Sequence, residues 1–362
     1  MVDVVNAHAK SGKYDKVEFF AGEINIRPSV PEPSVKVIKT IKYNKSSTLK
    51  RLLTWMGAFI HLLFVVWSRS NKTELMLFSN PPLNVFIPLF TKKKYRFVVY
   101  DLYPDSLFSQ GFVKENSFLG KFWINVNKKV FSRAESVITL SEDMKKAVSK
   151  YVDSSKIKIV YNWAHNEHMK PIKKEDNTFL KEHRLHDKFI VLYSGNMGMT
   201  HDIDVLVDVA NELKQNKNVH FMFIGEGAKK PIIENKIKDY GLENCTVLPY
   251  QPSNVLPFSM GAADIAVVTT DAKQSGLSVP SKTYTYMSTG AAMLCLCDEN
   301  TELYRLTQEK NIGKCYKRNQ IKEMARFVEL LSDDDNLLFT YKVNSRKASL
   351  VFSPENAKQY LI

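Results

Sequence analysis

The sequence predicts an α/β protein built on parallel sheets. Apolar runs typical of buried strands alternate with helical segments along the chain, and polar or glycine-containing loops follow many of these runs. The length of 362 residues is typical of two domains. A hydrophobic share of 44% and a charged share of 25% describe a globular protein with enough apolar residues for a core in each domain.

The first predicted domain, residues 1–165, opens with a helix. The spacing of Val2, Val5 and Ala9 predicts a helix over residues 1–10, and the apolar run Lys16–Ala21 predicts a strand. A nucleotide-type α/β domain normally begins with a strand and a glycine-rich turn that precede the first helix. We therefore expect this domain to lack its first strand.

Leu49–Trp67 is the most apolar segment of the chain. Its charge-free part from Leu52 onward has 16 residues, fewer than the roughly 20 that a membrane-spanning helix needs. Two interpretations remain, a buried core helix and a helix that lies on a membrane surface. In either case we expect His61 to be a packing residue.

The rest of the first half alternates strands with helices. The predicted strands are Leu75–Ser79, Tyr95–Tyr100, Ser136–Leu140 and Ile157–Tyr161. Asp101 and Asp105 follow the second of them, at the edge where open α/β sheets bind their ligands. Asp101 is therefore a candidate active residue, with a carboxylate that fixes a loop or caps a helix as the alternative.

The positive charge of the chain is concentrated in its first half. Residues 1–160 hold 26 Lys and Arg against 13 Asp and Glu, a surplus of 13 that equals the whole formal net charge. Such a basic half predicts an anionic partner, which could be nucleic acid, an anionic leaflet or a phosphate-bearing lipid, unless it is simply a solvated face. No nucleic-acid-binding motif is present. The four cysteines match neither a disulfide framework nor a zinc site, as expected in the cytosol.

A second α/β series follows a polar segment. Residues 166–188 are expected to form a linker with a short helix, residues 189–340 a second domain, and residues 341–362 a final helical segment. Three loops of the second domain, 194–198, 225–230 and 275–282, each follow a predicted strand. Since the carboxyl ends of parallel strands share one edge of a sheet, we expect these loops to converge and to hold a nucleoside diphosphate.

Glycines mark the first two loops. Gly195 and Gly198 allow the backbone to approach a phosphate closely. Gly225 and Gly227 match the first two glycines of a dinucleotide-binding fingerprint, but the third glycine of that motif is missing. The pattern therefore argues against a dehydrogenase.

The third loop leads into a helix that Pro280 opens and Gly290 ends. The unpaired N–H groups and the positive dipole at the start of this helix can bind a phosphate, and Lys282 adds a charge. The alternative is an ordinary strand–loop–helix unit whose hydroxyls cap the helix. Asp202 and Asp204 have the spacing of a metal-binding pair, but they lie where a helix begins, so we predict no metal site.

Taken together, the chain resembles the family-4 retaining glycosyltransferases of GT-B architecture, in particular the bacterial enzymes of O-antigen, capsule and exopolysaccharide assembly. The matching stretches are Ser79–Pro82, Asp101–Asp105, Val160–Trp163, Tyr193–Gly198, His201–Asp204, Phe223–Gly227, Val279–Lys282, Tyr286–Met287 and Gly290. They follow the family order over most of the chain.

The resemblance implies two Rossmann-like domains that face a cleft. The second domain would bind the nucleotide sugar, the first would bind the acceptor, and the final helix would cross back to the first. The donor-binding residues would be Gly195, Asn196, Gly198, His201, Gly225, Gly227, Tyr250, Ser278, Pro280, Ser281 and Thr285. The catalytic group would comprise Lys282 and Lys230, which stabilise the leaving diphosphate without a metal, and Asp101 at the acceptor hydroxyl.

The donor loops differ from the family pattern at four positions. Many members carry a glutamate where Thr285 stands and an acidic residue where Leu277 stands. They often have an arginine and a lysine at the positions of Asn196 and His201. Lys230 is expected to supply a charge instead, and the identity of the donor stays open.

The resulting functional prediction is a retaining, metal-independent glycosyltransferase of the hexosyltransferase type. It would move a sugar from a UDP- or GDP-linked donor to a lipid-linked saccharide in surface polysaccharide biosynthesis, with no cofactor. It would be cytoplasmic and peripheral on the inner face of the plasma membrane, bound through its basic N-terminal domain. The alternatives are a non-catalytic GT-B-like membrane-associated binding protein and a sugar-nucleotide 2-epimerase.

Overall fold

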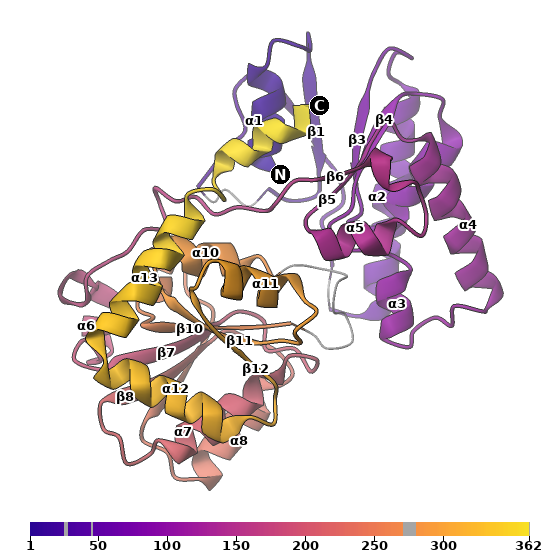
Figure 1. The fold of residues 1–362 in the computed structure, drawn as a ribbon. Coiled ribbons are helices and arrows are strands. Elements are labelled where there is room, and N and C mark those ends of the chain that lie inside the picture. The colour runs from indigo at the N-terminus through magenta and orange to yellow at the C-terminus, as the bar shows by residue number, and fades with distance from the viewer. Residues whose placement is uncertain (25–27, 45, 271–279, 362) are drawn as a thin grey trace. The chain divides into compact units, whose positions relative to one another are not determined.

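The computed structural model describes residues 1–24, 28–44, 46–270 and 280–361 (Figure 1). The described residues form two compact units. Unit 1 comprises residues 1–161 and 355–361, and unit 2 comprises residues 162–270 and 280–354. Every strand pair in both units is parallel, so the predicted α/β class is confirmed.

Unit 2 is built on one six-stranded sheet. Its strands are β7 (Phe189–Ser194), β8 (Val219–Ile224), β9 (Cys245–Leu248), β10 (Ile265–Thr269), β11 (Ala292–Leu296) and β12 (Gly313–Tyr316). They are arranged in the order β12-β11-β10-β7-β8-β9. The direction of winding reverses between β7 and β10, as in doubly wound folds, where ligands bind beyond the carboxyl ends of the strands at that point.

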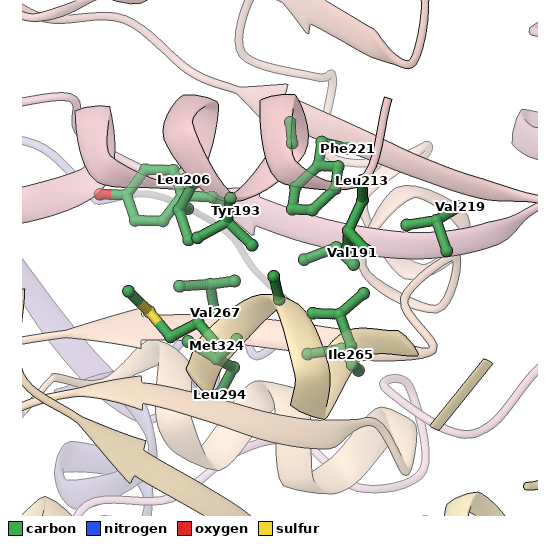
Figure 2. Packing of buried hydrophobic residues seen from close by; sticks show 14 of the residues in the cluster. Val191, Tyr193, Leu206, Leu213, Val219, Phe221, Ile265, Val267, Leu294 and Met324 are labelled. Atoms are coloured by element: carbon green, nitrogen blue, oxygen red, sulfur yellow. The ribbon is translucent and has the colours of Figure 1, made fainter. Parts of the chain in front are cut away.

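Helices cover this sheet. They are η3 (Lys174–Asp176), α6 (Thr178–Glu182), η4 (Asp202–Asp204), α7 (Val205–Glu212), α8 (Lys230–Asp239), α9 (Leu256–Met260), α10 (Lys282–Thr289), α11 (Glu302–Glu309), α12 (Ile321–Asp333) and α13 (Asp335–Ser349). The four central strands are buried along nearly their whole length. Leu206 of α7 and Met324 of α12 pack with Tyr193 and Phe221 of the sheet in one apolar core (Figure 2). Burial of each such side chain contributes about 1.5–3 kcal/mol.

Unit 1 contains two parallel sheets. β1 (Val17–Ala21) pairs with β2 (Val35–Lys39), and a second sheet has the order β3 (Leu75–Phe78), β4 (Tyr95–Val98), β5 (Val137–Thr139), β6 (Ile157–Ile159). Its helices are α1 (Val2–Lys10), α2 (Thr48–Trp67), η1 (Pro82–Phe90), α3 (Asp105–Ser109), α4 (Phe118–Arg133), α5 (Glu142–Val148) and η2 (Ser154–Lys156). The predicted helix over residues 1–10 is therefore present.

The segment 166–188, expected as a linker, packs within unit 2. Asp264, buried just before β10, binds Lys174 at 2.6 Å and Lys342 of α13 at 3.1 Å. The side-chain amide of Asn177 donates to the Phe258 carbonyl at 2.9 Å. These contacts attach both the segment and α13 to the sheet of unit 2.

The C-terminal region contains two helices, α12 and α13, that the sequence did not predict. The acidic stretch Asp333–Asp335 spans the junction between them, where Asp334 caps α13 by accepting a hydrogen bond from the Leu337 amide at 2.9 Å. In the described residues after 161, the chain returns to unit 1 in its last helix, η6 (Pro354–Leu361), from Glu355 onward. There the Tyr360 carbonyl accepts a hydrogen bond from Arg96 at 3.2 Å.

The apolar helix α2 is longer and more exposed than a core helix. Ser47 caps it by accepting a hydrogen bond from the Lys50 amide at 3.2 Å, and the helix runs for 20 residues. Among the described residues it is the one helix long and apolar enough to cross a membrane. Only 11% of its most apolar stretch is buried, so the core-helix interpretation is wrong.

Candidate functional site

The loops after β7 and β8 run side by side at the carboxyl edge of the unit 2 sheet. The amide of Gly195 donates to the Ile224 carbonyl at 2.8 Å, and the amide of Met197 donates to Glu226 at 2.8 Å. In return, the Lys229 amide donates to Met197 at 2.9 Å. This ladder extends the parallel pairing of the strands beyond their ends. It brings the predicted glycines 195, 198, 225 and 227 together.

Two of these glycines are required by the close approach of the loops. A Cβ atom on Gly225 would lie 1.9 Å from the Gly195 carbonyl oxygen, and one on Gly227 would lie 2.4 Å from the Met197 oxygen. Their φ angles of +145° and +151° also disfavour any other residue. The glycines therefore keep two loops in backbone contact and leave no side chain between them.

Lys282 reaches this pair of loops from the first turn of α10. Its ammonium lies beside Gly195, where an added Cβ atom would be 2.3 Å from Nζ, and 4.2 Å from the centre of the Tyr193 ring. Burial lowers the pKa of Lys282 to about 8. In the part of the chain that the structure describes, no carboxylate pairs with it. A partly buried cation that no described carboxylate neutralises, beside a glycine backbone, is suited to bind an anion.

The start of α10 adds the backbone amides of Ser281 and Lys282 as donors, since those of Thr283 and Tyr284 already donate to the Pro280 and Ser281 carbonyls at 3.1 and 3.3 Å. Ser281 occupies the N-cap position and makes no side-chain hydrogen bond to the helix, so its hydroxyl does not cap α10, while Ser275 lies outside the described residues. Pro280, Ser281 and Thr285 surround Lys282 in sequence, and Ser281 is exposed. Ser278 lies outside the described residues. The described part of this loop thus supplies N–H groups at the positive end of a helix.

Two buried tyrosines hold the first loop in place. The Tyr193 hydroxyl donates to the Asn196 carbonyl at 2.6 Å and lies 3.2 Å from Nδ1 of His201. The Tyr286 hydroxyl accepts a hydrogen bond from the Ser194 amide at 2.8 Å. Burial raises the pKa of both tyrosines, so they stay neutral. These supports come from residues whose role the sequence pattern did not indicate.

Lys230 and Tyr250 lie at the second loop. Lys230 binds Glu226 at 2.8 Å, and this hydrogen bond raises the pKa of Lys230. Tyr250 is 53% exposed. Burial of its hydroxyl raises the pKa of Tyr250, and a hydrogen bond to the Glu226 backbone acts in the opposite direction. Lys230 differs from Lys282 in that its charge is already paired.

Asp202 and Asp204 are bound by cations of the chain itself. Arg318, just after β12, pairs with both carboxylates, and buried Lys229 binds Asp204 at 2.5 Å. Burial would raise the pKa of Asp204, but hydrogen bonds from Lys229 and Arg318 outweigh it and lower the pKa. The pair therefore works as an ion-pair anchor behind the two loops. No sequence pattern pointed to Arg318, because it lies 114 positions from Asp204.

Asp101 lies at the carboxyl edge of the other sheet, in unit 1. Its carboxylate accepts a hydrogen bond from the Asn80 amide at 2.5 Å, and its backbone amide donates to the Ser79 hydroxyl at 3.1 Å. Asp101 lines a small pocket together with Ser79, Pro82, Val85, Phe97, Val99, Leu102, Tyr103 and Phe131.

Asp105 has a different environment from Asp101. It is buried and binds the Lys150 ammonium and, at 2.5 Å, the Tyr151 hydroxyl. Both carboxylates follow the same strand in the sequence, but Asp101 is the accessible one and Asp105 has a structural role.

Comparison with known proteins places this geometry in a family context. Residues 175–348 match the family model described as glycosyl transferases group 1. The probable glycosyltransferase WbjE of Pseudomonas aeruginosa is 27% identical over 320 residues, 85% of this chain and 79% of that protein. The putative colanic acid biosynthesis glycosyl transferase WcaI of Escherichia coli K12 is 26% identical over 195 residues, 53% of this chain and 48% of that protein.

Solved structures show the same fold. HepE of Anabaena, crystallised with UDP and glucose, superposes with a TM-score of 0.74 and 13% identity, over 99% of this chain and 93% of that one. At this identity the likeness concerns the fold alone. The fold is that of GT-B glycosyltransferases, with two Rossmann-like domains.

Proposed function

From the group 1 glycosyltransferase domain that this chain carries, we propose a retaining, metal-independent transfer of a sugar from a UDP- or GDP-linked donor to a lipid-linked saccharide. The pathway would be surface polysaccharide biosynthesis. WcaI, a relative of this chain, is named as a putative colanic acid biosynthesis glycosyl transferase, which is in keeping with this proposal. The enzyme would be cytoplasmic and peripheral on the inner face of the plasma membrane. A nucleotide-sugar donor is supported by HepE, whose structure holds UDP and glucose.

The partly buried ammonium of Lys282 carries the donor proposal. It lies beside the Gly195 backbone at the start of α10, at the edge where β7 and β10 mark the reversal of strand order. A diphosphate bound there would pair with Lys282 and receive hydrogen bonds from the amides of Asn196 and Gly198 and from those of residues 281 and 282 at the start of α10. Lys230 and His201 lie on the same two loops.

In the proposed reaction, the bond between the anomeric carbon and the donor phosphate oxygen breaks as the acceptor oxygen bonds to the same face of the sugar. The negative charge that develops on the departing diphosphate is stabilised by Lys282, Lys230 and the loop amides. The acceptor hydroxyl loses its proton, and we assign Asp101 to bind this hydroxyl and accept the proton.

The epimerase alternative is not favoured by the donor loops. An epimerase would need a cluster of available carboxylates. Glu226 pairs with Lys230, and Asp202 and Asp204 pair with Arg318, so the acidic groups of the described loops are neutralised. The proposal is tested by incubating the protein with UDP- and GDP-sugars and membrane extract, followed by mass analysis of the lipid-linked products. Release of a free epimerised sugar in place of a glycosylated lipid would contradict it.

The affinity for UDP is expected to fall as the pH rises above about 8. Below this pH Lys282 is already protonated in the free protein, because its pKa is about 8. Above it, binding of the diphosphate requires uptake of a proton, so the dissociation constant should rise by up to about tenfold per pH unit. Titrations of the protein with UDP between about pH 7 and 9 measure this change in the dissociation constant.

Lys282→Met provides the control for this pH dependence. Any titration of the nucleotide itself appears in both proteins, whereas the part due to Lys282 is lost in the variant. Parallel pH profiles for the two proteins would exclude Lys282 as the titrating group.

Replacing Asp101 by asparagine is expected to lower kcat by about a hundredfold, since the acceptor hydroxyl loses its base. The affinity for UDP should stay unchanged, because Asp101 belongs to unit 1 and the donor loops to unit 2. The contrast is Asp105→Asn, which leaves Lys150 without its partner and should lower the melting temperature. An Asp101→Asn protein that melts early and keeps its kcat would show a structural role instead.

A further inference from the structure

The solvent-facing side of α2 is a continuous apolar stripe. Seven side chains on this helix are between 46% and 68% exposed: Leu49, Leu52, Leu53, Met56, Ile60, Phe64 and Trp67. They follow one another at helical spacing, so they lie on one face. The stripe extends the full length of a 20-residue helix, about 30 Å. Soluble monomers rarely expose so large an apolar surface without a partner.

The opposite side of α2 is attached to unit 1. Leu63 and Val66 are buried, and Nδ1 of His61 lies 3.0 Å from the Thr40 hydroxyl. At the end of the stripe itself, the Trp67 indole also donates to the Phe90 carbonyl at 2.9 Å. A helix that crossed a bilayer would have to give up these polar and apolar contacts. The helix is therefore held with its long axis along the surface of the unit.

The elements around the stripe have the charge that an anionic surface requires. α2 and α4 both pack on η1, and none of the three contains an aspartate or a glutamate. α4 exposes Phe118, Leu119 and Phe122 together with Lys121, Lys128 and Lys129. Among the described residues, none of these three lysines forms an ion pair. Basic residues beside exposed aromatic and aliphatic groups are the signature of an interfacial helix.

We propose that α2 lies in the plane of an anionic bilayer, with its stripe inserted among the acyl chains and the lysines of α4 at the headgroups. The partner is thus a lipid surface, and α2 neither spans it nor pairs with a second copy of the chain. This inference deepens the proposed membrane location by naming the inserted element. It rests on the proposed function only in so far as a lipid-linked acceptor requires a membrane.

Flotation with phosphatidylcholine vesicles that contain phosphatidylglycerol tests the insertion. The wild-type protein should float, and Leu53→Gln/Phe64→Gln should bind at least about tenfold more weakly, because both side chains are 62% exposed and contribute only to the stripe. The matched control is Phe339→Gln/Val351→Gln in unit 2, whose original side chains are 68% and 63% exposed. This variant should float like the wild type. A stripe variant that floats like the wild type, or a wild type that does not float, overturns the proposal.

Two further measurements separate the rival partners. Alkaline carbonate should release the bound protein, and retention in the membrane would show a spanning helix and overturn the proposal. Analytical ultracentrifugation should show the same mass for the wild type and the stripe variant, and a dimer lost in the variant would assign the stripe to a second copy. Each of Lys121→Gln, Lys128→Gln and Lys129→Gln should weaken binding by about fivefold at low salt.

These outcomes are independent of the transfer reaction. UDP binding by the stripe variant, measured in the absence of lipid, should equal that of the wild type. If flotation fails and UDP still binds, the membrane inference is lost and the donor proposal stands. If flotation succeeds and UDP does not bind, the donor proposal is lost and the membrane inference stands.

Discussion

Replacing Lys282 by methionine is expected to weaken UDP binding by about a hundredfold and to lower kcat by a similar factor. Its partly buried ammonium lies beside Gly195 and the Tyr193 ring, and no described carboxylate pairs with it. Loss of a charged hydrogen bond in such a site costs about 1.5–3 kcal/mol, and removal of one donor to a developing oxyanion typically costs 10²–10³ in kcat. Methionine keeps the volume of the stem, so the fold should be retained.

Lys230→Met is the control for this prediction. Lys230 lies on the same pair of loops, but its charge is already paired with Glu226 at 2.8 Å. Its replacement should therefore weaken UDP binding only several-fold. Calorimetric titration of both variants with UDP gives the comparison. Equal losses would show that the burial of Lys282 has no special role, and an unchanged affinity in Lys282→Met would remove the phosphate site.

Gly225→Ala is expected to lower the melting temperature by about 10 °C and to abolish UDP binding. The new Cβ atom would lie 1.9 Å from the Gly195 carbonyl, so the loops must move apart. Overpacking of this kind costs about 1–3 kcal/mol, and the φ of +145° adds conformational strain. A loss of about 3 kcal/mol lowers the melting temperature of a unit of this size by about 6–12 °C.

Gly241→Ala separates strain from contact. Gly241 also has a positive φ, +61°, yet nothing lies within 4 Å of its would-be Cβ atom. Its replacement should cost only the conformational penalty, about 1–2 kcal/mol, and leave UDP binding intact. Both variants are compared by thermal unfolding and UDP titration. If Gly225→Ala behaves like Gly241→Ala, the two loops are not in the close contact described.

The sequence predicted the parts of the site that are local. Strand–loop–helix periodicity located the loops at 195–198 and 225–230, and Lys282 followed from its place in the first turn of a helix. The residues that support these loops could not be found in this way. Tyr286, Arg318 and Lys229 act through contacts with distant parts of the chain, and only the three-dimensional structure brings those parts together.

The exposure of α2 in unit 1 likewise could not be predicted from the sequence. Composition alone could not decide between a buried helix and an interfacial one for Leu49–Trp67, because both are apolar. The decision depends on which face of α2 the rest of unit 1 covers, and η1 covers only one. In α12 the buried apolar residues Met324, Val328 and Leu331 recur at helical spacing, so this helix could have been predicted from the sequence.

A crystal structure with UDP tests the central claim most directly. The account predicts the diphosphate at the carboxyl edge of the unit 2 sheet, within hydrogen-bonding distance of Lys282 Nζ and of the amides of Asn196 and Gly198. UDP bound elsewhere on the protein, with Lys282 still buried and unpaired, would contradict it.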